Sequence, residues 1–204
     1  MNRRTGLFGA IRSMSEEKVR RELMEDRIWQ DFGHRCAVMV LDSSGFTVSS
    51  STNGIVGYLC CISRLRDTVN GLLTGSGCPY FRFYADNIFA RFPEVAGALE
   101  AAFLIHETLA REKIMVCDDL DLRVCIGIGY GEVLLSEDEG VFGNEMNLAS
   151  KLGEDIAGPG EVLLTESAYG MVPAARRSLF IEKHGRVSGM DMKYYMTNAA
   201  APVE

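Results

Sequence analysis

Apolar residues along the chain follow two different patterns. A short continuous run predicts a strand, and a recurrence at helical spacing predicts a helix. Residues 36–41 (CAVMVL) form a short, continuous apolar run, which is typical of a strand buried on both faces of a sheet. Between residues 55 and 73 the apolar positions instead recur at helical spacing, until Gly75-Ser76-Gly77 ends the pattern. We therefore expect a buried strand followed by a long helix.

The middle of the chain predicts two β-hairpins. Residues 80–84 and 88–92 have strand character and are separated by Ala85-Asp86-Asn87, which has the side-chain chemistry of a tight turn. Residues 120–135 predict a second hairpin, with its turn at Gly129-Tyr130-Gly131. Hairpins that lie between helical segments favour a mixed sheet.

Three further helices and three further strands complete the expected order of elements. The helices cover residues 13–30, 93–111 and 143–156, and the strands cover residues 162–164, 179–182 and 192–196. The first of these helices opens with Ser13-Met14-Ser15-Glu16, the pattern of a capping box. Helices that alternate with strands predict one α/β sandwich in which helices pack on a mixed sheet. We expect an N-terminal helical segment over residues 1–33 and a single domain over residues 34–204.

Composition narrows the class of protein. The chain has 204 residues, 47% of them hydrophobic, which suits one core. The formal net charge of -7 argues against binding to a nucleic-acid backbone. The chain contains no uncharged apolar run of about 18 residues and no secretory leader, so we expect it in the cytoplasm without a membrane contact.

Two carboxylates are candidates for a metal site. Asp42 follows the buried strand and precedes the turn Ser43-Ser44-Gly45-Phe46-Thr47, whose N–H groups can hold a phosphate. On this segment alone, an Asp that caps a helix is the more common explanation. Asp86 stands at the first hairpin tip, where an ordinary turn residue is the alternative. If the two strands are neighbours, both carboxylates project from one sheet edge and can share Mg²⁺ or Mn²⁺ that carries a triphosphate.

A third candidate follows a glycine turn near residue 143. Asn147 and Lys151 are four residues apart, so a helix places this amide and this cation on one face. A surface pair of this kind is usually only solvated, and its position directly after the turn is what singles it out.

In order and spacing, these segments resemble the class III nucleotidyl cyclases, the family of adenylate and guanylate cyclase catalytic domains. The resemblance covers residues 36–196. It rests on five groups of residues: Asp42 with Gly45, Phe46 and Thr47; Arg82 with Asp86; Leu122-Arg123-Val124-Cys125-Ile126-Gly127; Gly143 with Asn147, Ala149 and Ser150; and Pro159-Gly160-Glu161. The family implies a ferredoxin-like sandwich as the fold.

The resemblance also implies a role for each residue. Asp42, Asp86 and the Ser43 backbone would hold two divalent cations, Mn²⁺ or Mg²⁺, while Gly45, Phe46 and Thr47 would cradle the triphosphate. In the family the site lies between two catalytic domains. Arg82, Asn147 and Lys151 would therefore come from the second subunit of a homodimer with composite active sites, and Asn147 would orient the ribose.

Three departures from the family pattern concern the base and the transition state. Adenylate cyclases place a Lys where this chain has Arg82, and an Asp or Thr where it has Gly140, so the usual purine-selecting pair is absent. Lys151 replaces the family's transition-state Arg, which keeps the charge but loses the bidentate geometry. Either the enzyme is impaired or it works on a differently seated nucleotide.

The second option resembles the stand-alone class III-like cyclases of the bacterial Pycsar anti-phage systems, whose cyclic pyrimidine nucleotides activate an effector. Uracil presents two carbonyl acceptors, so a donor-only Arg82 favours UTP as substrate and cyclic UMP as product. Cytidylate, adenylate or guanylate cyclase activity remains open as an alternative. A degenerate cyclase domain that binds a nucleotide without turnover is the rival from another class.

Overall fold

A sheet of eight strands organises the described part of the protein. The computed structural model describes residues 6–44, 46–117, 120–187 and 189–197. Its strands are β1 (Gly33–Ser43), β2 (Tyr80–Tyr84), β3 (Asn87–Phe92), β6 (Val124–Ser136), β7 (Gly140–Phe142), β8 (Val162–Thr165), β9 (Phe180–Val187) and β10 (Met190–Thr197). They lie in the order β2-β3-β1-β6-β8-β10-β9, with β7 paired to β6. Only the β6–β8 pair is parallel among the described pairs, so the predicted mixed sheet is confirmed.

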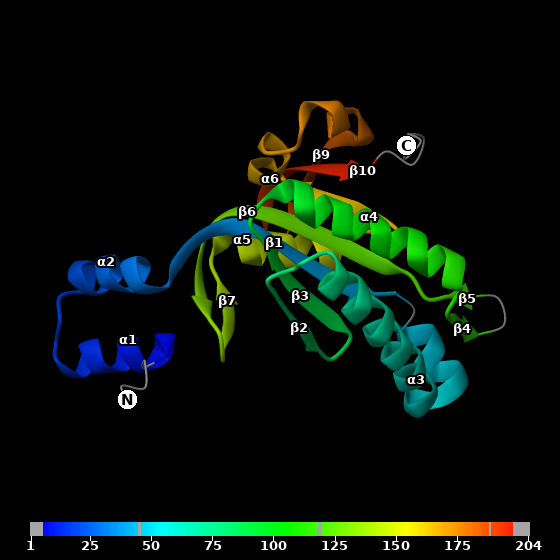
Figure 1. The fold of residues 1–204 in the computed structure, drawn as a ribbon, viewed down its shortest axis with the longest axis horizontal. Helices are drawn as coiled ribbons and strands as arrows, with labels where there is room; N and C mark the ends of the chain where they lie inside the picture. The colour runs from blue at the N-terminus through cyan, green and yellow to red at the C-terminus, as the bar shows by residue number, and fades with distance from the viewer. Residues whose placement is uncertain (1–5, 45, 118–119, 188, 198–204) are drawn as a thin grey trace.

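Helices cover both faces of this sheet (Figure 1). The helical segments are α1 (Leu7–Glu16), α2 (Arg21–Phe32), α3 (Phe46–Gly75), α4 (Val95–Glu112), α5 (Asn144–Ser150), the π-helix η1 (Lys151–Ile156), α6 (Glu166–Gly170) and the 3₁₀-helix η2 (Ala174–Leu179). A separate two-stranded sheet pairs β4 (Met115–Cys117) with β5 (Leu120–Asp121). None of the described helices combines the length and the apolar run that a membrane crossing requires.

Strand β1 is buried on both faces, as its apolar run predicts. Met39 and Leu41 pack in the larger core with residues of α3 and α4, whereas Val38 and Val40 pack in a smaller core with residues of α5. All four side chains have no exposed surface. Side chains alternate between the two faces of a strand. The side chains that follow Leu41 in β1 therefore point alternately to the α5–η1 side and to the α3 side of the sheet. Full burial of such a side chain contributes roughly 1.5–3 kcal/mol, which makes β1 a rigid support for the residues at its end.

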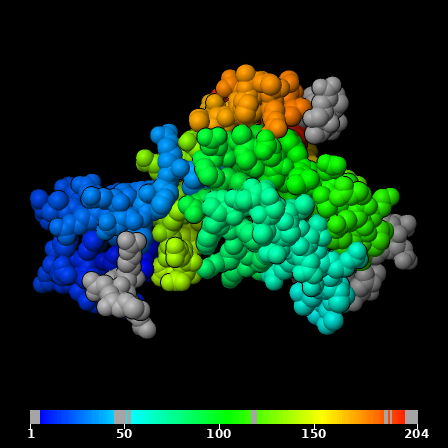
Figure 2. All heavy atoms as spheres, in the orientation of Figure 1, coloured from blue at the N-terminus to red at the C-terminus, as the bar shows by residue number. Residues whose placement is uncertain are grey.

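The N-terminal segment forms two helices, and the single helix predicted over residues 13–30 is wrong. Lys18 has a φ of 55°, a left-handed conformation that ends α1 and turns the chain into α2. Ser13 lies inside α1, where its hydroxyl donates to Glu17 at 3.2 Å and caps no helix start. The two helices stand out from the side of the molecule that carries β7 (Figures 1 and 2). Phe8 packs edge-on against Phe142 of β7, with ring centroids 5.4 Å apart.

The second predicted hairpin is also displaced. The turn expected at Gly129-Tyr130-Gly131 does not occur, because β6 runs without interruption through these residues and turns after Ser136. A Cβ atom at Gly131 would lie 2.7 Å from Cγ of Glu145. The glycines therefore allow α5 to lie directly on β6, and they do not mark a change of chain direction.

Other predicted elements are confirmed with shifted ends. The helix expected over residues 55–73 becomes α3, which begins at Phe46 and is kinked at Gly54, where φ is 70°. The helix expected from Pro93 begins two residues later, at Val95, after Glu94 in an extended conformation. The hairpin of β2 and β3 forms as predicted, with Ala85 at φ 51° in its tip.

Candidate functional site

The sheet brings Asp42 and Asp86 to one edge. Asp42 is the next-to-last residue of β1, and Asp86 lies in the turn between β2 and β3. Since β1 pairs with β3 from Ala37 to Leu41, the strand end and the hairpin tip are neighbours. The Ser43 hydroxyl donates a hydrogen bond to Oδ2 of Asp86 at 3.3 Å. The condition on which the shared site depended, neighbouring strands, is therefore met.

Tyr58 joins this pair and was not among the residues expected from the sequence. Its hydroxyl donates to Oδ2 of Asp86 at 3.0 Å and lies 2.6 Å from the Ser43 hydroxyl. The ring is 2% exposed and packs in the core between α3 and the sheet. In the sequence, Tyr58 falls within residues 55–73, whose apolar spacing predicts a helix, and that pattern assigns Tyr58 no role. A phenol among aliphatic residues was the available signal, since a buried Tyr hydroxyl usually needs a partner.

Helix α3 also holds the hairpin tip that carries Asp86. The Arg66 side chain donates to the Ala85 carbonyl oxygen, and its guanidinium lies over the Phe83 ring, 5.4 Å from the centroid. Tyr58 and Arg66 are eight residues apart, so the same helix face presents both to the tip. The position of Asp86 is thus fixed by α3 as well as by its own strands.

Burial and neighbouring carboxylates shape the charge of the site. The pKa of Asp42 is raised to about 6, first by burial and then by the charges of Asp86 and Glu154, while a hydrogen bond from the Ser43 N–H acts in the opposite direction. Burial also raises the pKa of Glu154, with Asp155 and Asp86 acting in the same direction and Lys151 opposing them. Burial raises the pKa of the Tyr58 hydroxyl as well, so it stays protonated and can donate. The edge therefore concentrates negative charge that a bound cation would neutralise.

The donor set fits a hard divalent cation. Carboxylate and main-chain oxygens are the ligands that Mg²⁺ and Mn²⁺ prefer, and such ions keep several positions for water or substrate phosphates. Within the described residues, no three His, Cys, Asp or Glu side chains converge as a closed metal site. Asp42 and Asp86 would therefore hold cations together with main-chain and substrate oxygens.

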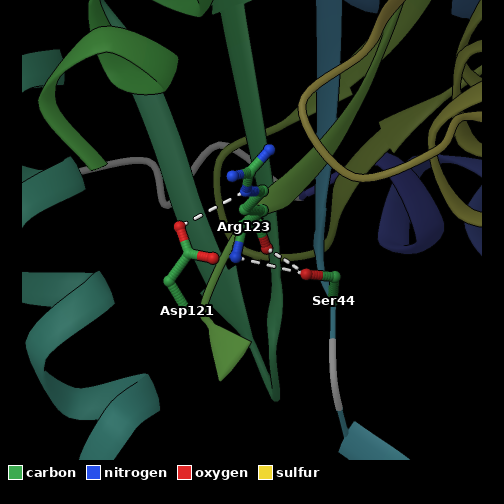
Figure 3. Close-up of polar contacts among 3 residues, drawn as sticks. All are labelled: Ser44, Asp121 and Arg123. Atoms are coloured by element: carbon green, nitrogen blue, oxygen red, sulfur yellow. Dashed lines mark hydrogen bonds and ion pairs between the residues drawn. The ribbon is translucent and has the colours of Figure 1, made fainter. Parts of the chain in front are cut away.

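Ser44, the residue after β1, is hydrogen-bonded to Arg123, which directly precedes β6 (Figure 3). The Ser44 hydroxyl donates to the Arg123 carbonyl oxygen at 3.0 Å and lies 3.2 Å from the Arg123 N–H, which donates to it. The Arg123 side chain in turn donates to Asp121 at 3.3 Å. These contacts hold the start of the turn in which phosphate contacts were expected. Gly45 lies outside the described residues; Phe46 and Thr47 begin α3, and their side chains also lie outside them.

Asn147 and Lys151 lie on the segment that begins at α5. Asn147 is exposed in α5, and Lys151 is the first residue of η1. Glu154, which acts on Asp42, comes seven residues after Asn147, or about 10 Å further along a helix axis. The C-terminal end of the α5–η1 segment therefore lies near the carboxylate pair of its own chain. Asn147 lies further from that pair, toward the start of the segment.

Glu145 anchors the start of this segment. Its carboxylate accepts hydrogen bonds from the Tyr130 N–H at 3.2 Å, the Thr165 hydroxyl at 2.8 Å and the Ser167 hydroxyl at 3.1 Å. These partners belong to β6, β8 and α6, so α5 is tied to three elements. Asn147 consequently projects from a rigid support.

Arg82 projects from β2 and makes contacts within its own chain. Its guanidinium donates from Nη1 to the Asp138 carbonyl at 2.7 Å and from Nη2 to the Glu137 carbonyl at 2.6 Å. Glu137 and Asp138 belong to the turn 137–139 between β6 and β7, and Gly140 begins β7. The structure therefore brings the Arg82 guanidinium to the turn that leads into Gly140, and these are the two positions that depart from the purine-selecting pattern.

Solved structures match the chain along most of its length. The guanylate cyclase domain of RhGC from Catenaria anguillulae, in complex with GTP, has a TM-score of 0.65 and 20% identity, covering 81% of this chain and 96% of that one. An adenylate/guanylate cyclase/hydrolase from Silicibacter pomeroyi has a TM-score of 0.68 and 20% identity, with coverages of 81% and 96%. The adenylyl cyclase CyaB from P. aeruginosa has a TM-score of 0.65 and 17% identity, with coverages of 83% and 97%.

These likenesses define the fold. The mixed sheet with helices on both faces is the fold of class III nucleotidyl cyclase catalytic domains. No protein-family model and no curated protein matches the chain. The activity must therefore be argued from the residues of the site.

Proposed function

We propose that the protein is a nucleotidyl cyclase that converts a nucleoside triphosphate to its 3′,5′-cyclic nucleotide and pyrophosphate. The observation that carries the proposal is the meeting of Asp42, Ser43 and Asp86 at one edge of a cyclase-type sheet. A half-buried like-charged pair is costly unless something neutralises it. A site for cations that carry a triphosphate gives these carboxylates that function.

In the proposed reaction the ribose 3′-oxygen attacks the α-phosphorus, the bond from that phosphorus to the bridging oxygen breaks, and pyrophosphate leaves. Two divalent cations, Mn²⁺ or Mg²⁺, would supply activation of the 3′-hydroxyl and neutralisation of the triphosphate. Asp42, Asp86 and the Ser43 main chain would hold these ions. The main-chain N–H groups of residues 45–47 would orient the phosphates, and the hydroxyl proton would pass to solvent.

We further propose that two chains form the complete site. Asn147 lies in α5, and it is the far end of the α5–η1 segment that approaches the carboxylates of the same chain. This placement favours a role for Asn147 in the active site of a second subunit. Ile55, Val56 and Leu59 are exposed by 53%, 71% and 54% on α3. Ile55 and Leu59 also line a cavity of about 330 Å³ that Asp86 borders. A large apolar surface beside the site supports a homodimer in which Asn147 orients the ribose and Lys151 neutralises charge in the transition state.

For the base we propose uracil, with UTP as substrate and cyclic UMP as product. Arg82 already donates to two carbonyl oxygens of its own chain, the same acceptor chemistry that uracil offers. Gly140 has no side chain with which to select a purine. On this proposal cyclic UMP is a second messenger in anti-phage defence and acts on a cyclic-nucleotide-sensing effector. Cytosine, adenine and guanine are the alternative bases.

A second candidate is a degenerate domain that binds a nucleotide without turnover. Lys151 favours it, because a lysine is a point charge and lacks the planar fork of arginine. The retained pair Asp42 and Asp86 speaks against it, because binding alone does not require two half-buried carboxylates at one edge.

One assay separates these functions. The purified chain is incubated with Mn²⁺ and each of the four ribonucleoside triphosphates, and products are identified by mass. We expect cyclic UMP with pyrophosphate as the main product. Cyclic AMP or cyclic GMP as the main product would retain the cyclase and overturn the base. Nucleotide binding without any cyclic product would support the degenerate domain.

A further inference from the structure

An oxygen atom of the Asp86 carboxylate lies beside two hydroxyl oxygens from other parts of the chain. Oδ2 of Asp86 lies 3.0 Å from the Tyr58 hydroxyl and 3.3 Å from the Ser43 hydroxyl, and the two hydroxyls lie 2.6 Å apart. Whichever hydroxyl donates to the other, one proton remains for the carboxylate. Hydrogen bonds to an ionised acceptor are about twice as strong as neutral ones, so this contact holds the carboxylate firmly.

Both hydroxyl contacts end on the same oxygen of Asp86. A carboxylate that is held at Oδ2 is restricted in its rotation, and neither hydroxyl contact involves its second oxygen, Oδ1. A cation ligand whose orientation is fixed in advance binds without the cost of ordering it. The two hydroxyls are therefore placed to orient Asp86 as a ligand for a cation.

Tyr58 is the better-fixed member of the hydroxyl pair. Its ring is 2% exposed in the core, and a tyrosine has only two rotatable side-chain bonds. The kink at Gly54 sets the direction of α3 shortly before it. Arg66, eight residues later on the same face, holds the hairpin tip through the Ala85 carbonyl. Helix α3 thus fixes both the main chain at the tip and the Asp86 carboxylate.

We propose that Tyr58 is a positioning residue that orients the Asp86 carboxylate for a divalent cation, an inference that rests on the proposed function. Tyr58 acts through Asp86 and needs no contact with the nucleotide. Removal of its hydroxyl should weaken cation binding while the fold and the recognition of the nucleotide remain.

The test is Tyr58→Phe, which keeps the buried ring and removes only the hydroxyl. Binding of Mn²⁺ alone is followed by the loss of the free-ion signal in electron paramagnetic resonance. We expect the dissociation constant to rise about tenfold, as is common when a group that orients a ligand is removed. In the cyclase assay, the Mn²⁺ concentration for half activation should rise by a similar factor, and KM for the nucleotide at saturating Mn²⁺ should not change.

Two further variants test the same hydroxyl network. Ser43→Ala should weaken Mn²⁺ binding in the same direction, and the double variant should fall short of the sum of the two effects, because the hydroxyls share one acceptor. Tyr194→Phe, on β10 at the opposite end of the sheet, is the matched control and should leave binding unchanged. Thermal unfolding of all variants reports whether the fold is retained.

The outcomes distinguish this inference from the proposed function. If Tyr58→Phe binds Mn²⁺ as the wild type does, while Asp86→Asn loses binding, Tyr58 only packs in the core and the inference is wrong. If wild-type protein binds Mn²⁺ no more tightly than the double variant Asp42→Asn with Asp86→Asn, the metal site fails, and the proposed function fails with it.

Discussion

A Cβ atom at Gly129 would lie 2.6 Å from the carbonyl oxygen of Glu145, closer than non-bonded atoms tolerate. Glycine at this position of β6 allows α5 to rest directly on the sheet. The same helix carries Asn147. The absence of a side chain at Gly129 therefore determines how closely this proposed substrate contact lies to the sheet.

Gly129→Ala should therefore displace α5. We expect a loss of about 1–3 kcal/mol in the free energy of unfolding, because the added methyl group overpacks a rigid contact with main-chain atoms. Urea denaturation measures it. Gly71→Ala is the control: no atom lies within 4 Å of its added Cβ on α3, and alanine in a helix should be neutral or slightly stabilising. Equal stability of the two variants would contradict the close approach.

Gly129 also shows why part of the fold was not predictable. From the sequence, Gly129-Tyr130-Gly131 resembles a turn, since glycine is frequent wherever the chain reverses. The actual reason for the glycines is a helix more than ten residues away in sequence. A local pattern carries no information about such a contact, whereas the periods of β1 and α3 depend on burial along one element and were predictable.

Arg82 should control the choice of base. If its guanidinium reads uracil carbonyls, Arg82→Ala should lose the preference for UTP over ATP by roughly 5- to 150-fold, which corresponds to 1–3 kcal/mol for unpaired polar groups. Arg82→Lys should be nearly as severe, because lysine lacks the planar fork. Competition between the two nucleotides measures the ratio, with exposed Arg111→Ala on α4 as the control. A mild Arg82→Lys effect would show that charge alone matters.

His106 should make the fold sensitive to mild acid. Burial lowers the pKa of His106 to about 4, opposed by a hydrogen bond with the Glu161 main chain and assisted by the Arg123 charge. The unfolded chain protonates first, near pH 6.5, so this contribution to stability is present at pH 7 and is lost as the pH falls toward 4. Between pH 7 and pH 5 the loss is about 2 kcal/mol.

The comparison that isolates this histidine is between wild type and His106→Leu. Both proteins contain the same carboxylates, so the difference between their unfolding free energies should change by about 2 kcal/mol from pH 7 to pH 5. Parallel pH profiles would mean that His106 is protonated as readily in the folded protein as in the unfolded chain.

Composite active sites predict complementation. Asp42→Asn removes a carboxylate, Asn147→Ala removes the ribose contact, and each variant alone should be inactive. A mixed dimer contains one site in which both residues are intact, so mixing the variants should restore up to about a quarter of wild-type activity. Subunit exchange is verified by mass spectrometry. No recovery after verified exchange would place all contacts of a site in one chain.

The site was predictable to different extents. The places of Asp42, Ser43 and Asp86 at a strand end and a hairpin tip follow from local patterns, whereas their role toward a metal comes from the family resemblance and stays a prediction. The role of Tyr58 was not predictable, because this residue lies on the apolar face of a helix. The contacts of Arg82 were not predictable either, because they are with a turn about 55 residues away. Such partners depend on the order of strands in the sheet, which local periodicity does not determine.

The most direct test of the account is the amount of cyclic nucleotide formed by Asp86→Asn and by Asp42→Asn. Each substitution keeps the shape of the side chain and removes a charge that the proposed cations require. Products from UTP and Mn²⁺ are quantified by mass, with Asp191→Asn on β10 as the control and thermal unfolding as the check of the fold. We predict that both variants fold but lose at least about 100-fold of the wild-type rate, a barrier increase of about 2.7 kcal/mol. Wild-type turnover by a folded Asp86→Asn protein would contradict the proposed metal site.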